Sequence, residues 1–235
     1  MDTPKLYLFP VPLSDVPPRQ VLPGSNLELL LGIRYFVVEN LRSARRFLKA
    51  CDRSIDINAL EFTELSEHTP AGEVDAMLEP MERGFSIGVI SEAGCPAVAD
   101  PGADLVAAAQ RRGYDVVPLV GPSSILMSLM ASGFNGQCFT FNGYLPIDAA
   151  ARSRRLRDMQ QAIRRDRCTQ IFIETPYRNN RLIEELCRTL PGDMLLCVAS
   201  DISGPRQRIT TRRIDQWRKL KPDYDKIPAI FLLFI

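Results

Sequence analysis

The sequence predicts an α/β protein of two domains, with a mostly parallel sheet in the first domain and a mixed sheet in the second. Short apolar strands alternate with helical segments through the first half, which is typical of a parallel sheet covered by helices. A Gly121-Pro122 step then interrupts the pattern and predicts domains 1–120 and 121–235. Beyond this step, strands outnumber helices toward the end of the chain, which favours a mixed sheet.

In the first half, short apolar runs predict the strands, and apolar residues spaced three and four apart predict the helices. Gly113 ends the last of these helices, because glycine readily leaves the helical conformation. The predicted strands are Lys5–Phe9, Ile33–Val38, Leu60–Leu65, Ser86–Ile90 and Val116–Val120, and the predicted helices are Leu41–Cys51, Gly72–Arg83 and Asp104–Arg112.

The second half is predicted from the same spacings. A helix at Ser123–Ser132 is ended by Gly133, and a long polar helix at Asp148–Arg167 carries one apolar stripe. That stripe consists of Leu156, Met159 and Ile163. The other predicted elements are the strands Cys138–Asn142, Thr169–Glu174, Met194–Ala199, Gln207–Thr211 and Ala229–Ile235, the helix Arg178–Leu190, and a short helix around Trp217.

Charge is distributed unevenly between the two halves. The net charge of +1 divides into −6 over residues 1–120 and +7 over residues 121–235. The basic residues of the second half gather in two clusters, Arg152, Arg154, Arg155, Arg157, Arg164, Arg165 and Arg167, then Arg206, Arg208, Arg212, Arg213, Arg218, Lys219 and Lys221. Clustered cations favour binding of a polyanion such as a nucleic acid. A solvated helix face with charged strand edges is the alternative.

Histidine and cysteine usage excludes several classes of site. His68 is the only histidine, and the six cysteines are scattered without a C-x-x-C pair. We therefore expect no metal site, Ser-His-Asp triad or Cys-His dyad. Unpaired thiols, the absence of a signal-peptide layout, and the absence of an apolar run of membrane-spanning length favour a cytoplasmic protein without a membrane segment.

The stretch Ile90–Gly102 is the most informative part of the sequence for function. It links a strand to a helix at the carboxyl end of a predicted parallel strand, where open α/β sheets bind ligands. Its small residues let a ligand approach the backbone closely, and its prolines stiffen the loop. An ordinary turn, in which Asp100 and Pro101 open the next helix, is the alternative.

Two other turns bear on which ligand would fit. The turn Gly121–Ser124 also leaves a strand and enters a helix, and a helix-capping serine is its simpler explanation. The segment Phe9–Ser14 after the first strand contains no glycine, which excludes a dinucleotide-type glycine-rich turn and a P-loop there. An adenosine cofactor would therefore be held in some other way.

The segment Ile90–Gly102, followed by Val117–Ser124, resembles the tetrapyrrole methylase superfamily. The sequence is most similar to the small-subunit ribosomal RNA cytidine 2′-O-methyltransferase family within it. Further agreement follows in order along nearly the whole chain, in Leu6-Tyr7, Glu39–Arg42, Phe141–Pro146 and Phe172–Arg178. The resemblance implies a two-domain homodimer that binds S-adenosylmethionine in a cleft between its domains.

The resemblance also implies which residues line the sites. The cofactor-binding residues would be Pro12, Ser91, Ala93, Gly94, Pro96, Val98, Gly121, Ser123, Ser124, Glu174, Ala199, Pro228 and Ala229. The substrate-binding residues would be Glu39, Arg42, His68, Asp100 and Arg178. Several positions depart from the family pattern, among them Ser66–Thr69, where only His68 is retained, and Ser200–Gly204, which lacks a lysine. These departures fall largely on the substrate side, so the cofactor is better supported than the substrate.

Simpler explanations exist for two of the implied substrate contacts. His68 lies beside a carboxylate near a predicted helix start and would commonly be structural or exposed to solvent. Glu39 and Arg42 could form an exposed pair at the start of a helix.

The predicted function is S-adenosylmethionine-dependent methylation of a ribose hydroxyl in ribosomal RNA. Methylation of a tetrapyrrole or another small anion, and cofactor binding without turnover, are the alternatives. Methyl transfer from a sulfonium is a displacement that gains mainly from alignment, and a ribose hydroxyl also gains from a base or a stabilising cation. Glu39, Asp100, Arg42 and Arg178 are candidates for these roles, and the sequence assigns no catalytic residue.

Overall fold

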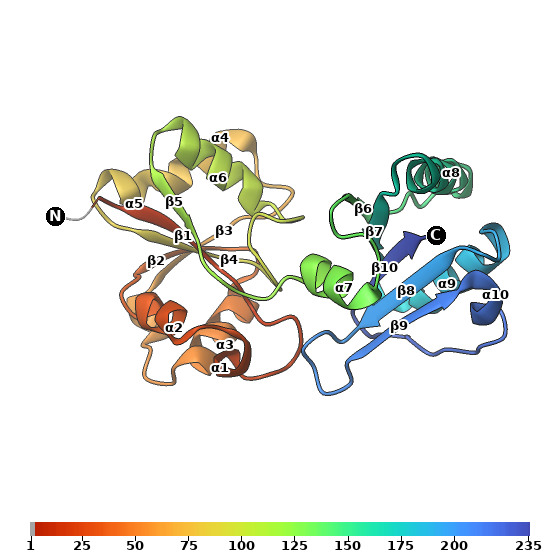
Figure 1. The fold of residues 1–235 in the computed structure, drawn as a ribbon. Helices are drawn as coiled ribbons and strands as arrows, with labels where there is room; N and C mark the ends of the chain where they lie inside the picture. The colour runs from red at the N-terminus through yellow and green to blue at the C-terminus, as the bar shows by residue number, and fades with distance from the viewer. Residues whose placement is uncertain (1–2) are drawn as a thin grey trace. The chain divides into compact units, whose positions relative to one another are not determined.

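The computed structural model describes residues 3–235. The chain forms two compact units, the first ending at Ser123 and the second spanning Ser124–Ile235. The first contains a parallel sheet and the second a mixed sheet, which confirms the predicted fold class (Figure 1).

The sheet of the first unit has the order β3-β2-β4-β1-β5, and all its strand pairs are parallel. Its strands are β1 (Lys5–Phe9), β2 (Tyr35–Val38), β3 (Glu61–Glu64), β4 (Ile87–Ile90) and β5 (Asp115–Pro118). The inner strands β2 and β4 are buried along their whole length, which explains their uninterrupted apolar sequences. Pro118 lies in the edge strand β5, where a missing backbone N–H is tolerated.

Helices cover both faces of this sheet (Figure 1). They are α1 (Pro18–Val21), α2 (Gly24–Leu30), α3 (Leu41–Cys51), α4 (Ala71–Val74), α5 (Glu79–Glu82) and α6 (Gly102–Arg111), with 3-10 turns η1 (Ile57–Ala59) and η2 (Asp75–Leu78). Because alternate strand residues point to opposite faces, Phe36 and Val38 pack in the core beside α1–α3. Tyr35 and Val37 pack in the core beside α4–α6.

Two segments differ from the sequence-based prediction. The single helix expected at Gly72–Arg83 is divided into α4, η2 and α5, and Pro80 lies at the start of α5. Proline has no N–H to donate to the preceding turn, so a continuous helix cannot run through it. The short helices α1 and α2 were not predicted, because the three prolines between Val16 and Gly24 make that segment read as a loop.

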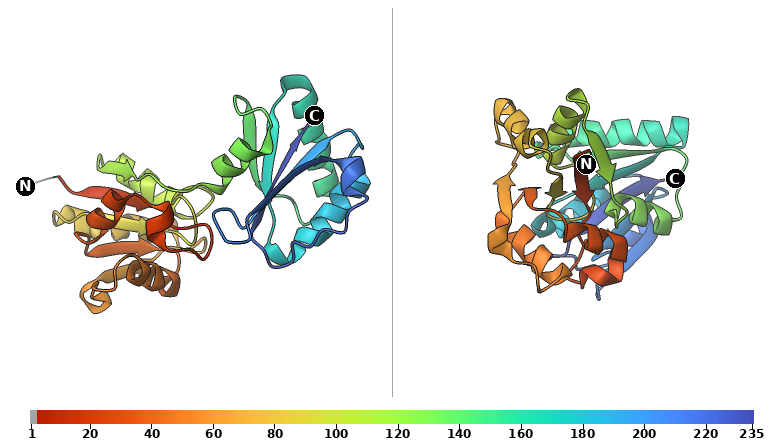
Figure 2. Two further views of the ribbon diagram at one scale, coloured as in Figure 1. Left: turned by 60° about the horizontal axis from the view of Figure 1, so that its bottom comes forward. Right: turned by 90° about the vertical axis from the view of Figure 1, so that its left-hand side faces the viewer.

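The second unit contains a sheet of order β6-β7-β10-β8-β9, in which only β6 and β7 are parallel. Its strands are β6 (Phe139–Tyr144), β7 (Thr169–Ile173), β8 (Leu195–Ser200), β9 (Arg208–Arg213) and β10 (Ala229–Phe234). Its helices are α7 (Ser124–Ser132), α8 (Ala149–Asp166), the 3-10 turn η3 (Pro176–Arg178), α9 (Asn179–Thr189) and α10 (Ile214–Trp217). Helices α8 and α9 lie on one face of this sheet and α7 on the other (Figure 2, left).

Helix α8 shows how local sequence sets an element's limits. The Asp148 carboxylate accepts a hydrogen bond from the Ala151 N–H at 2.8 Å and caps the start of the helix. Arg167 ends the helix in the left-handed conformation, with φ of 53°. Between them Leu156, Met159 and Ile163 are buried in the core of the unit, as the apolar stripe predicted.

All six cysteines are free thiols. Burial raises the pKa of Cys51 to about 12 and that of Cys197 to about 11, so these thiols are unreactive near neutral pH. Across residues 3–235, no helix combines the length and apolar character needed to cross a bilayer. Over the same range, no group of three or more His, Cys, Asp or Glu residues is arranged to hold a metal ion.

Candidate functional site

The candidate site lies at the carboxyl ends of the parallel strands of the first unit. From β1 the chain crosses over β4 to reach β2, whereas from β4 it crosses over β1 to reach β5. The connections from these two adjacent strands therefore leave in opposite directions, which is the arrangement that opens a ligand-binding crevice in α/β sheets. Residues 10–17 and 91–101 form the two loops that border it.

Gly94 joins these two loops. The Val11 N–H donates to the Gly94 carbonyl at 2.8 Å, and the Gly94 N–H donates to the Val11 carbonyl at 3.0 Å. Gly94 has a φ of 74°, and a Cβ placed on it would lie 3.2 Å from Leu13 Cδ2 and 3.7 Å from the Pro122 carbonyl oxygen. The Cys95 thiol also contacts that Pro122 oxygen at 3.5 Å. Three loops therefore meet at a position that only glycine fits without strain.

The loop after β5 packs at the same carboxyl end of the parallel sheet. A Cβ on Gly121 would lie 2.2 Å from Pro10 Cβ, so the glycine lets the Pro10 ring pack directly against the backbone of residue 121. The side-chain amide of Asn26, which lies in α2, donates a hydrogen bond to the Val120 carbonyl at 2.8 Å. Gly121 thus lies beside the predicted cofactor loop, whereas Ser123 ends the first unit and Ser124 begins α7 in the second.

Asp100 orders the remainder of the loop after β4. Its Oδ1 atom accepts hydrogen bonds from the Ala97 N–H at 2.9 Å and from the Gly102 N–H at 2.8 Å. Ala97 and Ala99 both have positive φ, of 66° and 61°, which is strained for residues with a side chain and is common at functional loops. The structure thus supports the turn that the sequence left open as an alternative for Asp100, and its contact with substrate stays a prediction.

Burial raises the pKa of the Asp100 carboxyl above its ordinary value, although the two N–H donors and the nearby Ser91 hydroxyl lower it. The Ser91 hydroxyl is itself buried and makes no hydrogen bond of good geometry within residues 3–235. Of the other predicted cofactor residues in this loop, Pro96 is buried, whereas Ala93 and Val98 are exposed. Pro12 is half-buried in the loop after β1.

Glu39 lies where the chain leaves β2 and is tied directly to the loop after β4. Its N–H donates to the Ile90 carbonyl at 3.1 Å, and its Oε2 atom accepts a hydrogen bond from the Glu92 N–H at 3.0 Å. Burial raises the pKa of Glu39, and the charges of Asp100, Glu92 and Glu67 raise it further, against the lowering effect of the Glu92 N–H. Glu39 is therefore a carboxylate that holds a proton more readily than an exposed glutamate does.

The remaining predicted substrate residues of this unit are exposed. Arg42 lies in the first turn of α3, which begins after the Asn40 side chain caps the Ser43 N–H at 3.0 Å. The His68 side chain is 87% exposed, and its Nε2 atom lies 3.7 Å from Glu67 Oε1. This position favours the solvent-facing interpretation of His68, and its substrate role stays a prediction.

The predicted cofactor residues of the second unit gather at one edge of its sheet. Ala229 pairs with Ser200, and Ile230 pairs with both Ala199 and Ile173. The end of β7, the end of β8 and the start of β10 therefore lie side by side, and the Asp201 N–H donates to the Pro228 carbonyl at 3.0 Å. Ala199 is fully buried, which argues against contact between its side chain and a ligand.

Glu174 and Arg178, two more predicted site residues, bind each other. The Glu174 Oε1 atom accepts hydrogen bonds from Arg178 Nε at 2.9 Å and Nη2 at 2.6 Å, and from the Thr175 N–H at 2.6 Å. The pair fixes η3 where the chain leaves β7. Any ligand that uses either side chain must share or replace this ion pair.

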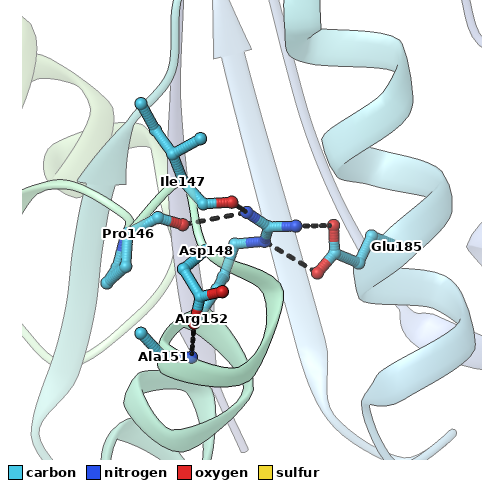
Figure 3. Close-up of polar contacts among 6 residues, drawn as sticks. All are labelled: Pro146, Ile147, Asp148, Ala151, Arg152 and Glu185. Atoms are coloured by element: carbon cyan, nitrogen blue, oxygen red, sulfur yellow. Dashed lines mark hydrogen bonds and ion pairs between the residues drawn. The ribbon is translucent and has the colours of Figure 1, made fainter.

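A second ion pair in this unit ties three segments together (Figure 3). The Arg152 guanidinium makes two bonds to the Glu185 carboxylate, from Nε at 2.7 Å and from Nη2 at 2.8 Å. Its Nη1 atom donates to the carbonyls of Pro146 at 2.8 Å and Ile147 at 2.7 Å. Both charged side chains are largely buried, at 14% and 16% exposure, so the pair joins α8, α9 and the loop after β6.

Arg152→Ala is expected to lower the free energy of unfolding of this unit by about 3 kcal/mol, because Glu185 would keep a largely buried and unpaired charge. Chemical denaturation followed by circular dichroism measures this change. Arg165→Ala, which breaks the exposed pair between Arg165 and Asp166, is the matched control and should leave the transition midpoint unchanged. Equal destabilisation by the two substitutions would contradict the assignment.

The sequence alone missed several contributors to the site. Val11, Leu13 and Pro122 surround Gly94, and Cys95 and Glu92 bind groups from other loops. Most of them act through backbone atoms, which leave no signal in residue type. In the segment after β1, Pro10 and Pro12 are the signal that the sequence offers for a stiff loop.

Sequence comparison finds relatives that share one name. No family model matches the chain. It is 29% identical over 203 residues to the ribosomal RNA small subunit methyltransferase I of Vibrio cholerae, covering 85% of this chain and 65% of that protein. It is 27% identical over 219 residues to the protein of the same name from Mycobacterium bovis, covering 92% of this chain and 72% of that protein. The chain thus spans slightly less than two thirds of the length of the first of these relatives.

Solved structures share the fold. The methyltransferase CobJ superposes with a TM-score of 0.61 at 17% identity, covering 92% of this chain and 88% of that one. Uroporphyrin-III C-methyl transferase from Thermus thermophilus, in complex with S-adenyl homocysteine, superposes with a TM-score of 0.56 at 18% identity, covering 98% and 97% of the two chains. By sequence the chain is thus similar to proteins named ribosomal RNA small subunit methyltransferase I, and by fold to CobJ and uroporphyrin-III C-methyl transferase, in agreement with the predicted resemblance to the tetrapyrrole methylase superfamily.

Proposed function

We propose that the chain is an S-adenosylmethionine-dependent methyltransferase that modifies a ribose hydroxyl of ribosomal RNA. One observation carries the proposal. The loops after β1 and β4 are joined by backbone hydrogen bonds between Val11 and Gly94, at the point where the connections from these two strands leave in opposite directions. The relatives named as ribosomal RNA methyltransferases support the same chemistry.

The residues present suit a sulfonium nucleoside. Gly94 leaves no side chain at the point where three loops meet, and Ser91 offers a buried hydroxyl that lacks a good hydrogen-bond partner within residues 3–235. Exposed backbone and small side chains at Ala93 and Val98 complete the surface of the loop. In the second unit, Glu174, Pro228 and Ala229 lie together at one end of the sheet and are the cofactor-binding residues proposed for that unit.

The donor, when bound, would supply a methyl group activated by its positive sulfur. A ribose hydroxyl must lose its proton as it accepts that group, so it gains from a nearby carboxylate. We assign this role to Glu39, whose Oε1 atom has no hydrogen-bond partner within residues 3–235 while Oε2 is held by the Glu92 N–H. Arg42, three residues further along, would stabilise the negative oxygen or a neighbouring phosphate.

We also propose a homodimer in the cytoplasm. The exposed apolar residues Leu126 and Met130 lie four residues apart on α7, at 52% and 82% exposure, and such a stripe favours burial against a second copy. The six free thiols favour a reducing compartment. Sedimentation equilibrium tests the dimer directly, and a monomer at micromolar concentration would contradict it.

A transfer assay with a tritiated methyl donor tests the function. Small ribosomal subunits, free ribosomal RNA and the small-molecule fraction of a cell extract serve as separate acceptors. We expect label in the RNA, on a nucleoside methylated at its 2′-oxygen. Label in the small-molecule fraction alone would replace RNA with a small substrate, and no label in any fraction despite donor binding by calorimetry would rule out an enzyme.

A further inference from the structure

Helix α8 presents a stripe of arginines to solvent. Successive residues of a helix are rotated by about 100°, which places Arg154, Arg157, Arg164 and Arg165 within a sector of about 100°. All four are exposed, and the buried Leu156 lies on the opposite side of the helix. From Arg154 to Arg164 the stripe is about 15 Å long, at a rise of about 1.5 Å per residue.

Three of these charges have no carboxylate partner. Arg165 pairs with Asp166, but the side chains of Arg154, Arg157 and Arg164 form no ion pair or hydrogen bond with any other residue of the described range 3–235. The other arginines of this helix are engaged elsewhere, because Arg152 binds Glu185 and Arg155 donates to the Asn142 side chain at 2.6 Å. The three unpaired arginines form a continuous positive surface.

This surface is not needed for folding. Helix α8 is held by its apolar stripe, its Asp148 cap and the Arg152 ion pair, none of which involves the unpaired arginines. Arg154 and Arg157 lie three residues apart, and like charges at that spacing weaken a helix. Exposed charges that support no contact within the chain favour an external partner of opposite charge.

We infer that Arg154, Arg157 and Arg164 dock the phosphate backbone of an RNA. A nucleic-acid strand carries one negative charge per about 3.4 Å of axis, so a stripe of about 15 Å faces about four phosphates. Between Arg154 and Arg165 this exposed sector consists of Arg154, Arg157, Gln161, Arg164 and Arg165, and Asp158 lies just outside it. The sector contains no apolar side chain to enter a lipid bilayer, which favours RNA over a membrane. The inference rests on the proposed RNA substrate and names the surface that receives it.

The test compares two triple variants that remove the same charge. R154Q/R157Q/R164Q removes the stripe, and R19Q/R46Q/R53Q removes three exposed arginines of the first unit. Binding of a fluorescent small-subunit ribosomal RNA fragment is measured by anisotropy between 50 and 300 mM salt. For the stripe variant we expect a salt slope reduced by about two to three and an affinity lower by on the order of 100-fold at 0.1 M salt. For the control we expect a change of at most about threefold, from the altered net charge alone.

The outcomes distinguish failure of the proposed docking surface from failure of the proposed enzymatic function. Wild-type protein that binds and methylates RNA while both triple variants bind equally would overturn the docking surface and leave the proposed function in place. Wild-type protein that neither binds RNA nor methylates it would overturn the proposed function instead. A stripe variant that loses binding to polyglutamate or to anionic phosphatidylserine vesicles, but keeps its affinity for RNA, would assign the surface to an acidic protein or a membrane and overturn the inference.

Discussion

Replacing Glu39 with Gln is expected to reduce the rate of methyl transfer by about 10²–10⁴-fold, the range that a positioned general base contributes. Gln keeps the oxygen that accepts the Glu92 N–H at 3.0 Å, so the loop contact survives while the proton acceptor is lost. The affinity for S-adenosylmethionine, measured by calorimetry, should stay within about twofold of wild type, because a donor site built from backbone does not use this carboxylate.

Glu64→Gln is the matched control. Glu64 also lies at the carboxyl end of a strand and accepts a backbone hydrogen bond, from Leu41 N–H at 2.9 Å, but its side chain is exposed. This variant should keep full activity. If Glu39→Gln retained wild-type turnover, or if both variants lost it equally, Glu39 would not be the base.

The pH dependence follows from the direction of the pKa shift. Burial and neighbouring carboxylates raise the pKa of Glu39 above its ordinary value of 4.5. Only the ionised form accepts a proton, so activity should rise with pH through the raised pKa, and Glu39→Gln should remove this limb of the profile. A wild-type profile that stays flat down to the ordinary glutamate range would contradict the assignment.

The same shift predicts how stability changes with pH. A carboxyl whose pKa is higher in the folded state than in the unfolded state stabilises the fold fully when the pH is below its unfolded-state pKa. This stabilisation is lost as the pH rises through its folded-state pKa. Near neutral pH the charged Glu39 therefore opposes folding relative to a neutral side chain. Glu39→Gln should be at least as stable as wild type there, which separates loss of activity from loss of fold.

The fold could be predicted because its elements are coded locally. Buried parallel strands such as Ile87–Ile90 are continuous apolar runs, and a helix such as Leu41–Cys51 shows its buried face every three or four residues. The prediction failed where proline rather than periodicity decides the structure, in the division of the helix at Pro80 and in the short helices between Val16 and Leu30.

The candidate site could be predicted only to the level of its loops. The small residues after β4 marked the segment in which the candidate site lies, because close approach of a ligand to the backbone demands them. The bridge between Val11 and Gly94 joins residues 83 positions apart through main-chain atoms, and no side-chain pattern encodes it. The raised pKa of Glu39 likewise depends on burial and on Asp100, Glu92 and Glu67, which only the folded chain brings near.

Gly94→Ala is expected to weaken binding of S-adenosylmethionine by about 10-fold or more, while Gly113→Ala leaves it unchanged. Both glycines have a φ of 74°, so alanine at either position carries the same left-handed backbone strain, of about 1–2 kcal/mol. They differ in what the new Cβ meets. At Gly113 nothing lies within 4 Å, whereas at Gly94 it meets Leu13 Cδ2 at 3.2 Å and the Pro122 oxygen at 3.7 Å.

Comparing Gly94→Ala with Gly113→Ala therefore separates the effect of disturbing the three-loop junction from the effect of backbone strain, which both variants share. Thermal unfolding should show a similar loss of stability in both variants, with at most a small excess for Gly94→Ala from the tighter contact. Donor affinity by calorimetry should fall only in Gly94→Ala, because moving Leu13 or Pro122 separates the loops that form the proposed backbone surface. If the two variants bound the donor equally well, the surface around Gly94 would not be where the cofactor is held, and the proposed site would have to lie elsewhere in the chain.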